Sequence, residues 1–78
     1  MSVAYRLHCA NINEVENVYV GVIEFKTRDA NEMAKYIQGL GEDADELYTI
    51  EEYHEDDAGN ECGDPKYYLP GDFMKGVE

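Results

Sequence analysis

The residues of this sequence that could do chemistry are mostly carboxylates, and they are concentrated in residues 42–57. This segment has nine acidic side chains in sixteen residues and neither lysine nor arginine. Carboxylates at this density can bind hard metal ions through their oxygens, or they can bind the lysines and arginines of another protein. The nine acids are Glu42, Asp43, Asp45, Glu46, Glu51, Glu52, Glu55, Asp56 and Asp57.

The spacing of these acids does not match a calcium loop. An EF-hand loop needs oxygen ligands at positions 1, 3, 5, 7, 9 and 12 and a glycine at position 6. A loop that begins at Asp56 has Glu61 at the glycine position, and one that begins at Asp57 has Cys62 there. A metal-dependent fold, in which divalent ions neutralise the C-terminal segment 55–78, stays open as an alternative.

Zinc binding is also disfavoured by spacing. Neighbouring residues on a strand point to opposite faces, so His8 and Cys9 are poorly placed to bind one ion, and His54 and Cys62 lack the paired spacing of a zinc finger. Cys9 and Cys62 are enough for one disulfide, but a cytosolic chain normally keeps its thiols reduced, so two free, half-buried thiols are favoured over the disulfide. We therefore expect no cofactor.

Sequence signatures of catalysis are missing. There is no glycine-rich phosphate loop, no nucleophile elbow, and no pair of cysteine and histidine at a recognisable spacing. Six lysines and arginines against eighteen acids leave no basic stripe that could neutralise phosphates. We expect a protein that is not an enzyme and does not bind nucleic acid directly.

The charge is unevenly distributed along the chain. Residues 1–40 have a net charge of −1, from five acids and four bases, and residues 41–78 have a net charge of −11, from thirteen acids and two lysines. A chain of 78 residues supports one hydrophobic core, which predicts a single domain over residues 1–78. The first half is interpreted as the scaffold and the second half as the charged face.

Two features predict a cytoplasmic protein without membrane association. No run of 18 apolar residues could span a bilayer, and the first 20 residues lack the basic start and apolar block of a secretory signal.

The elements that must position the acids begin with two strands. Apolar residues alternate through residues 3–10, which predicts a strand with its odd positions facing the core. After a polar loop, β-branched and aromatic residues in 18–25 predict a second strand that completes a hairpin. The side chains expected to face inward are Val3, Tyr5, Leu7, Cys9, Tyr19, Ile23 and Phe25.

A helix is predicted to begin at Ala30. Asp29 is followed three residues later by Glu32, the pattern in which the first side chain caps the helix and the second reaches back to it. Apolar residues then recur at spacings of three and four and form a stripe that can pack on a sheet. The stripe consists of Ala30, Met33, Ala34, Ile37 and Leu40.

The rest of the chain predicts one more strand and a looser end. Residues 47–53 have strand propensity, and both faces carry large side chains, of which Tyr48 and Ile50 are favoured as the inward ones. Residues 55–78 are rich in Gly, Pro, Asp and Asn and are expected to be an irregular acidic segment, with a short edge strand at 66–69. The predicted fold is α+β, an antiparallel sheet of three to four strands with one helix on one face, in ββαβ order.

The density of carboxylates suggests a partner. Alternate residues of a strand lie roughly 6.6 Å apart, so a row of acids approaches the charge density of a nucleic-acid backbone. Such a row attracts the basic grooves of proteins that bind nucleic acids, and tyrosines add contacts to guanidinium groups. We therefore expect the partner to be a basic nucleic-acid-binding protein or complex, contacted by the nine acids together with Tyr48 and Tyr53.

In its general character the sequence resembles DNA-mimicking inhibitors of phages and mobile elements, such as anti-CRISPR and anti-restriction proteins. The resemblance rests on residues 42–57 and on the small size, and it carries over no motif and no residue role. It implies an inhibitor that acts in the host cytoplasm.

A different class of function is the alternative. The second predicted strand has Val18, Val20 and Val22 on its outer face. An exposed apolar face of this kind favours self-association, so the chain would then be a structural or subunit-type interaction domain that forms a homodimer, with acids for solubility only.

Overall fold

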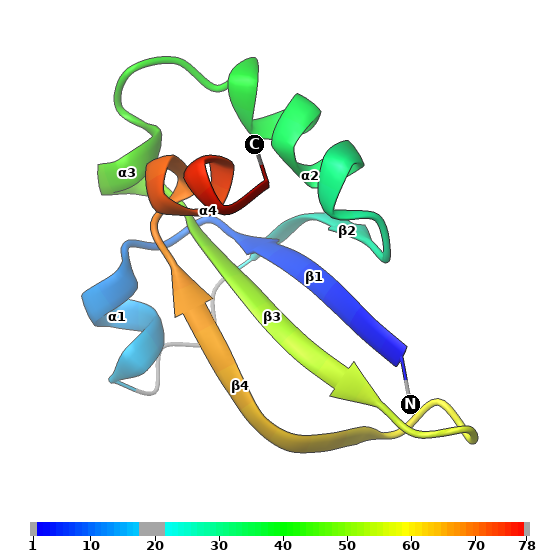
Figure 1. Ribbon diagram of the computed structural model, residues 1–78. Coiled ribbons are helices and arrows are strands. Elements are labelled where there is room, and N and C mark those ends of the chain that lie inside the picture. Colours follow the sequence, from blue (N-terminus) through cyan, green and yellow to red (C-terminus); the bar gives the residue numbers. More distant parts are fainter. Residues whose placement is uncertain (1, 18–21, 78) are drawn as a thin grey trace.

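The computed structural model describes residues 2–17 and 22–77 and has an α+β fold with a four-stranded antiparallel sheet (Figure 1). In chain order the elements are β1 (Ser2–His8), α1 (Ile12–Glu16), β2 (Ile23–Thr27), α2 (Ala30–Gln38), α3 (Ala44–Leu47), β3 (Thr49–Glu55), β4 (Glu61–Tyr68) and α4 (Pro70–Val77). The strands are arranged in the order β2-β1-β3-β4. The predicted antiparallel α+β class is confirmed, but the order ββαβ with a single helix omits α1, α3 and α4.

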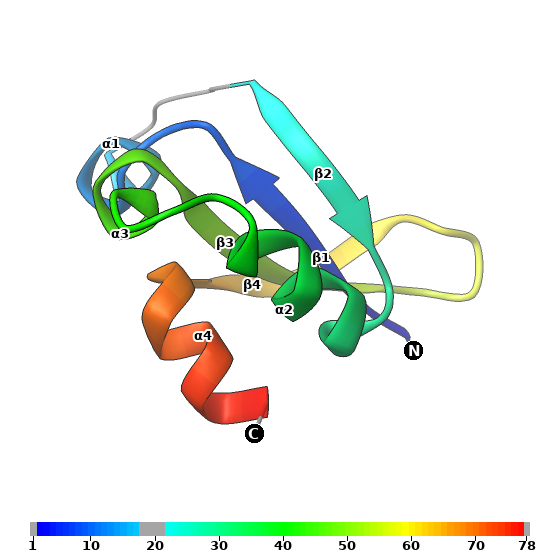
Figure 2. The same cartoon turned by 90° about the horizontal axis from the view of Figure 1, so that it is seen from above.

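The core lies between the sheet and the helices α2 and α4, which cover the same face (Figure 2). Leu7 and Ile50 are opposite each other in the register of β1 and β3, and both are fully buried. They confirm the inward faces predicted for the first and third strands. Val3 is exposed instead of inward, because the helices cover only the other end of β1. The buried cluster consists of Leu7, Met33, Ala34, Ile37, Ile50 and Phe73.

The start of α2 follows the prediction in part. Asp29 caps the helix, because its side chain accepts a hydrogen bond of 2.9 Å from the backbone N–H of Asn31. Glu32 does not reach back to Asp29. Instead, the hydroxyl of Thr27 donates to Glu32 at 2.9 Å and accepts from the backbone N–H of Asp29 at 3.1 Å. The hydroxyl at the end of β2 thus takes the place of the direct contact.

The polar segment after β1 contains a short helix where a loop was expected. Asn11 caps α1 by accepting a hydrogen bond of 2.9 Å from the backbone N–H of Glu14. Val15 of this helix is buried. A single buried apolar residue in a polar segment is a weak helical pattern, which explains why the sequence did not predict α1.

The second strand begins later than predicted. Val18, Tyr19 and Val20 lie outside the described residues, so the orientation predicted for them stays a prediction. In β2, Phe25 is half-buried and stacks on Tyr36 of α2, with ring centroids 4.3 Å apart.

Ile23 does not face the core as predicted. The register pairs Leu7 with Phe25 but His8 with Ile23, so Glu24 is an extra residue between the two pairs. Residues directly opposite each other share a face, and the irregularity therefore places Ile23 on the face of His8. Ile23 is 38% exposed.

The prediction of an irregular segment over residues 55–78 is wrong, because β4 and α4 occupy most of it. Asp56 closes the turn before β4 by accepting hydrogen bonds from the backbone N–H groups of Ala58 and Asn60 at 3.0 and 2.9 Å. Gly59 has a φ of 86°, a conformation that favours glycine. Pro70 begins α4, where its missing N–H costs nothing. The Gly, Pro and Asp residues thus join regular elements.

The longest described helix, α2, has nine residues. Within residues 2–17 and 22–77, no helix combines the length and the apolar character needed to cross a bilayer.

Candidate functional site

The nine acids of residues 42–57 do not form one surface. Residues 42–46 lie in and next to α3 at one end of the sheet, and residues 55–57 lie at the hairpin at its other end (Figure 1). The seven residues of β3 rise by about 3.3 Å each, so the two ends are roughly 20 Å apart. Glu51 and Glu52, in the middle of β3, point to opposite faces. The expected continuous row is therefore wrong, and each group of acids has its own surroundings.

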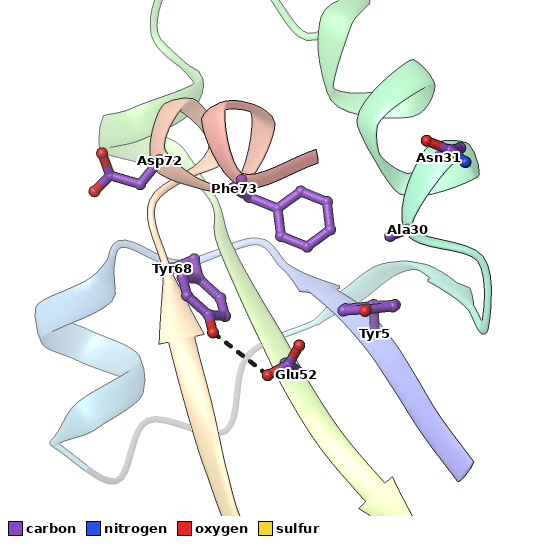
Figure 3. A pocket seen from close by; sticks show the side chains of 8 residues that line it. Tyr5, Ala30, Asn31, Glu52, Tyr68, Asp72 and Phe73 are labelled. Carbon is purple, nitrogen blue, oxygen red and sulfur yellow. Dashed lines mark hydrogen bonds between the residues drawn. The ribbon is translucent and has the colours of Figure 1, made fainter. Parts of the chain in front are cut away.

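On the face covered by helices, a groove of about 350 Å³ lies between the sheet, the start of α2 and α4 (Figure 3). The ring centroid of Phe73 is 5.3 Å from that of Tyr5 and 6.2 Å from that of Tyr68, and both contacts are edge-to-face. Glu52 and Asp72 bring two carboxylates to the same lining. We call this site the aromatic groove and define it by Tyr5, Glu52, Tyr68, Asp72 and Phe73.

Glu52 determines the electrostatics of the aromatic groove. The hydroxyl of Tyr68 donates a hydrogen bond of 3.4 Å to its carboxylate. Burial and the nearby charge of Glu52 raise the pKa of Tyr5 and of Tyr68, so both phenols are protonated at neutral pH. Lys66 is opposite Glu52 in the register of β3 and β4, but it is exposed and forms no ion pair with Glu52 in the described part of the chain.

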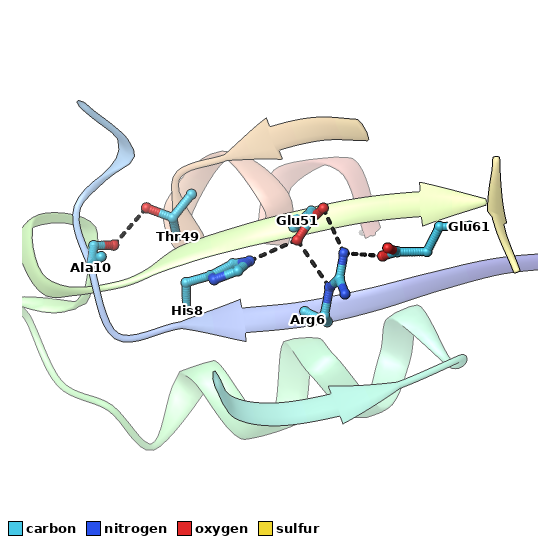
Figure 4. Close-up of polar contacts among 6 residues, drawn as sticks. All are labelled: Arg6, His8, Ala10, Thr49, Glu51 and Glu61. Atoms are coloured by element: carbon cyan, nitrogen blue, oxygen red, sulfur yellow. Dashed lines mark hydrogen bonds and ion pairs between the residues drawn. The ribbon is translucent and has the colours of Figure 1, made fainter. Parts of the chain in front are cut away.

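Glu51, on the other face of the sheet, is an internal counter-ion (Figure 4). Glu51 as a whole residue is only 6% exposed. The guanidinium of Arg6 donates two hydrogen bonds to its carboxylate, at 3.0 and 2.8 Å, and His8 Nε2 lies 2.7 Å from Glu51 Oε1. Glu51 is therefore buried against its own chain and is not available to a partner, contrary to the prediction.

The surroundings of this pair favour the charged forms. Burial alone would raise the pKa of Glu51, but the hydrogen bonds from Arg6 and His8 outweigh it and lower that pKa. Burial alone would lower the pKa of Arg6, and the hydrogen bonds and charge of Glu51 raise it instead. Arg6 also forms an ion pair with Glu61, and its guanidinium lies 4.0 Å from the ring centroid of Tyr53. Tyr53 is thus engaged within the chain.

Other predicted site residues also have structural contacts. Glu55 pairs with Arg28 at 3.0 Å. Asp56 holds the hairpin turn described above, and Asp57 next to it is exposed. Tyr48 is half-buried and packs against the core cluster, so it is not an exposed anchor.

Four of the nine acids are exposed in and next to α3, which contacts α4. Asp72, in the first turn of α4, belongs with them because its neighbour Gly71 donates a backbone hydrogen bond of 2.9 Å to Asp45. Within the described residues, none of these carboxylates forms an ion pair. We call this surface the α3–α4 acidic group, defined by Glu42, Asp43, Asp45, Glu46 and Asp72.

Sequence reasoning did not find Asp72 and Phe73, because residues 55–78 were expected to be irregular. Pro70 followed by an acid two residues later is typical of the first turn of a helix and could have indicated α4. The role of Tyr5 depends on its packing against Phe73, which a strand pattern alone cannot predict.

The structure offers no specific metal centre within its described residues, where no three His, Cys, Asp or Glu side chains are grouped so as to hold an ion. Cys9 and Cys62 are free and half-buried. Comparisons of the chain with protein-family models, with curated proteins and with solved structures found no match.

Proposed function

We propose that this protein is an acidic interaction domain that binds the basic surface of a nucleic-acid-binding protein or complex and competes there with the polynucleotide. Its action would be that of an inhibitor of the anti-CRISPR or anti-restriction type, in the cytoplasm, without catalysis and without direct contact to nucleic acid. The observation that carries the proposal is the α3–α4 acidic group, which gathers five exposed carboxylates without an ion pair in the described structure.

The distribution of cations supports this choice of surface. Arg6 and Arg28, both arginines of the chain, pair with Glu51, Glu61 and Glu55, which lie on the strands and not in the α3–α4 acidic group. The chain has a net charge of −12, so carboxylates that lie close to one another on its surface repel each other. Lysines and arginines of a partner would relieve this repulsion and would be steered to the surface before contact.

The proposed contact set differs from the one predicted from sequence. Glu51, Tyr53 and Tyr48 leave the set because they are engaged within the chain. Glu55, which pairs with Arg28, and Asp56, which closes the hairpin turn, leave it for the same reason. Glu52 stays in the set through the aromatic groove, which adjoins the α3–α4 acidic group because Asp72 belongs to both.

Competitive elution tests the proposal. The immobilised protein is incubated with cell lysate at low salt, and retained proteins are eluted at constant ionic strength with either a short duplex DNA or polyglutamate at the same concentration of charge. We expect the retained proteins to include nucleic-acid-binding proteins, and we expect DNA to release them at concentrations at which polyglutamate releases few of them. Equal release by both polymers would show that only charge is recognised and would contradict the proposal.

A matched pair of variants locates the contact. The triple variant Glu42→Gln, Asp43→Asn, Glu46→Gln should lose the DNA-released proteins. The control Glu14→Gln, Glu16→Gln, Asp64→Asn removes the same charge from exposed positions on α1 and β4 and should retain them. Equal losses in the two variants would contradict the assignment to the α3–α4 acidic group.

The exposed apolar residues next to β2 favour a second candidate, the subunit-type domain. Val22 is 70% exposed and Ile23 38% exposed, and β2 is an edge strand. Light scattering should then detect a dimer at high concentration that Val22→Glu weakens and Leu47→Glu, at a position 57% exposed on α3, does not. A monomer at every concentration would rule out this candidate.

A further inference from the structure

The protein already contains one site that holds a guanidinium group, the site of Arg6, and the groups around it show what such a site requires. On the face of the sheet opposite α2 and α4, the guanidinium of Arg6 is held by the carboxylate of Glu51 on β3 through two hydrogen bonds and lies 4.0 Å from the ring centroid of Tyr53. A carboxylate accepts the planar fork of a guanidinium in two places while an aromatic ring stacks on its face. Glu51 and Tyr53, together with the ion pair from Glu61, thus show which groups hold an arginine side chain against β3.

The aromatic groove repeats this combination on the opposite face. Glu52, the next residue of β3, lies among the rings of Tyr5, Tyr68 and Phe73. The hydroxyl of Tyr68 donates to its carboxylate, and burial, the charge of Glu52 and a hydrogen bond to the same carboxylate raise the pKa of Tyr5. Because a carboxylate has about four acceptor positions, about two remain for a guanidinium. In the described part of the chain no lysine or arginine pairs with it.

We infer that the aromatic groove binds an arginine side chain of the partner, with Glu52 as the bidentate acceptor and the three rings as the surface for the guanidinium and its alkyl stem. This inference rests on the proposed function, because the arginine belongs to the basic partner. The volume of about 350 Å³ is near the lower limit of ligand pockets, roughly 300 Å³, which suits one side chain rather than a secondary-structure element.

Half-burial of Glu52 strengthens its interaction with a cation, and the geometry of its carboxylate selects arginine. A carboxylate that is partly removed from water interacts more strongly with a cation than an exposed one does. A lysine has one compact charge and cannot form the two parallel hydrogen bonds, so arginine is preferred. Asp72 at the same groove adds negative charge.

The test uses three short peptides that differ in a single residue: Ac-Gly-Ser-Xaa-Ser-Gly-amide with arginine, lysine or citrulline at Xaa. Binding is followed by NMR through the ring protons of Tyr5, Tyr68 and Phe73. We expect saturable shifts with the arginine peptide, weaker binding of the lysine peptide, and at least about tenfold weaker binding of citrulline, which has the shape of arginine without its charge.

Variants separate the groove from general electrostatics. Glu52→Gln should weaken the arginine peptide about tenfold or more, whereas Asp64→Asn, which removes the same charge from an exposed position of β4 outside both proposed sites, should change its affinity less than about twofold. Tyr68→Phe keeps the ring and removes one hydrogen bond to the carboxylate, so it should bind the arginine peptide at least as well as the wild type.

Equal binding of the arginine and citrulline peptides, or unchanged affinity in Glu52→Gln with an intact fold by circular dichroism, would overturn the inference. The two proposals fail separately. A partner that is released by DNA but is retained equally by Glu52→Gln would refute the arginine site and leave the proposed function standing. Specific arginine binding without any DNA-released partner would do the reverse.

Discussion

The carboxylate of Asp45 accepts a hydrogen bond of 2.9 Å from the backbone N–H of Gly71, 26 residues further along the chain. This bond joins α3 to the first turn of α4, whose N–H groups have no partner within the helix. A Cβ atom at position 71 would lie 3.2 Å from the carboxylate, so glycine allows the close approach. The contact holds the α3–α4 acidic group together across two elements.

Loss of this contact should destabilise the fold by a measurable amount. We expect Asp45→Ala to lower the free energy of unfolding by about 1 kcal/mol, the usual effect of removing a helix cap. Asp43→Ala is the matched control, because Asp43 precedes α3 without a side-chain capping bond. Urea denaturation measures both variants, and equal losses would show that the bond to Gly71 contributes nothing.

Breaking the pair of Arg6 and Glu51 should lower the free energy of unfolding strongly, whereas replacing both residues together should lower it less. Glu51→Gln leaves the part-buried Arg6 without its main partner, and we expect a loss of about 3 kcal/mol. Replacing the pair by apolar residues, as in Arg6→Met with Glu51→Leu, should lower stability less than the single change, because no part-buried guanidinium is left without its carboxylate and the remaining partner of Arg6, Glu61, is exposed to water. A double variant that is less stable than Glu51→Gln would contradict this account.

The lowered pKa of Glu51 predicts a pH dependence of stability. A carboxyl group whose pKa is lower in the folded chain stabilises the fold fully above its ordinary value of 4.5. This contribution decreases as pH falls below that value towards the lower pKa of the folded state. The other acids change repulsion in both proteins alike, so the wild type is compared with Glu51→Gln.

Urea denaturation at about pH 6 and about pH 3 measures this effect. The difference in unfolding free energy between wild type and Glu51→Gln should be large at the higher pH and should shrink at the lower one. A difference that is the same at both values would mean that Glu51 does not have a lowered pKa.

The sequence predicted the elements that carry a regular apolar pattern. Leu7 and Ile50 alternate with polar neighbours, and Met33 and Ile37 follow helical spacing, so their burial could be predicted from local pattern alone. The Gly, Pro and Asp residues of 55–78, among them Gly59 in the turn between β3 and β4, make the whole segment appear irregular in sequence. Averaged with these turn residues, the patterns of β4 and α4 are not visible.

The candidate site was harder to predict than the fold. Alternation along β3 places Glu51 and Glu52 on opposite faces, which the sequence does show. That Arg6 neutralises Glu51 depends on the register between β1 and β3, which pairs residues 45 positions apart. The register is set by tertiary packing, so no local pattern indicates which acid is buried and which is left for a partner.

The central claim is that the α3–α4 acidic group binds a basic surface. Its most direct test is the salt dependence of affinity for a partner obtained by DNA elution, measured by isothermal titration calorimetry with wild type and with Glu42→Gln, Asp43→Asn, Glu46→Gln. The account predicts that log Kd rises with log salt for the wild type, and that the variant binds at least about tenfold more weakly with a smaller slope. The same affinity and the same slope in both proteins would contradict it.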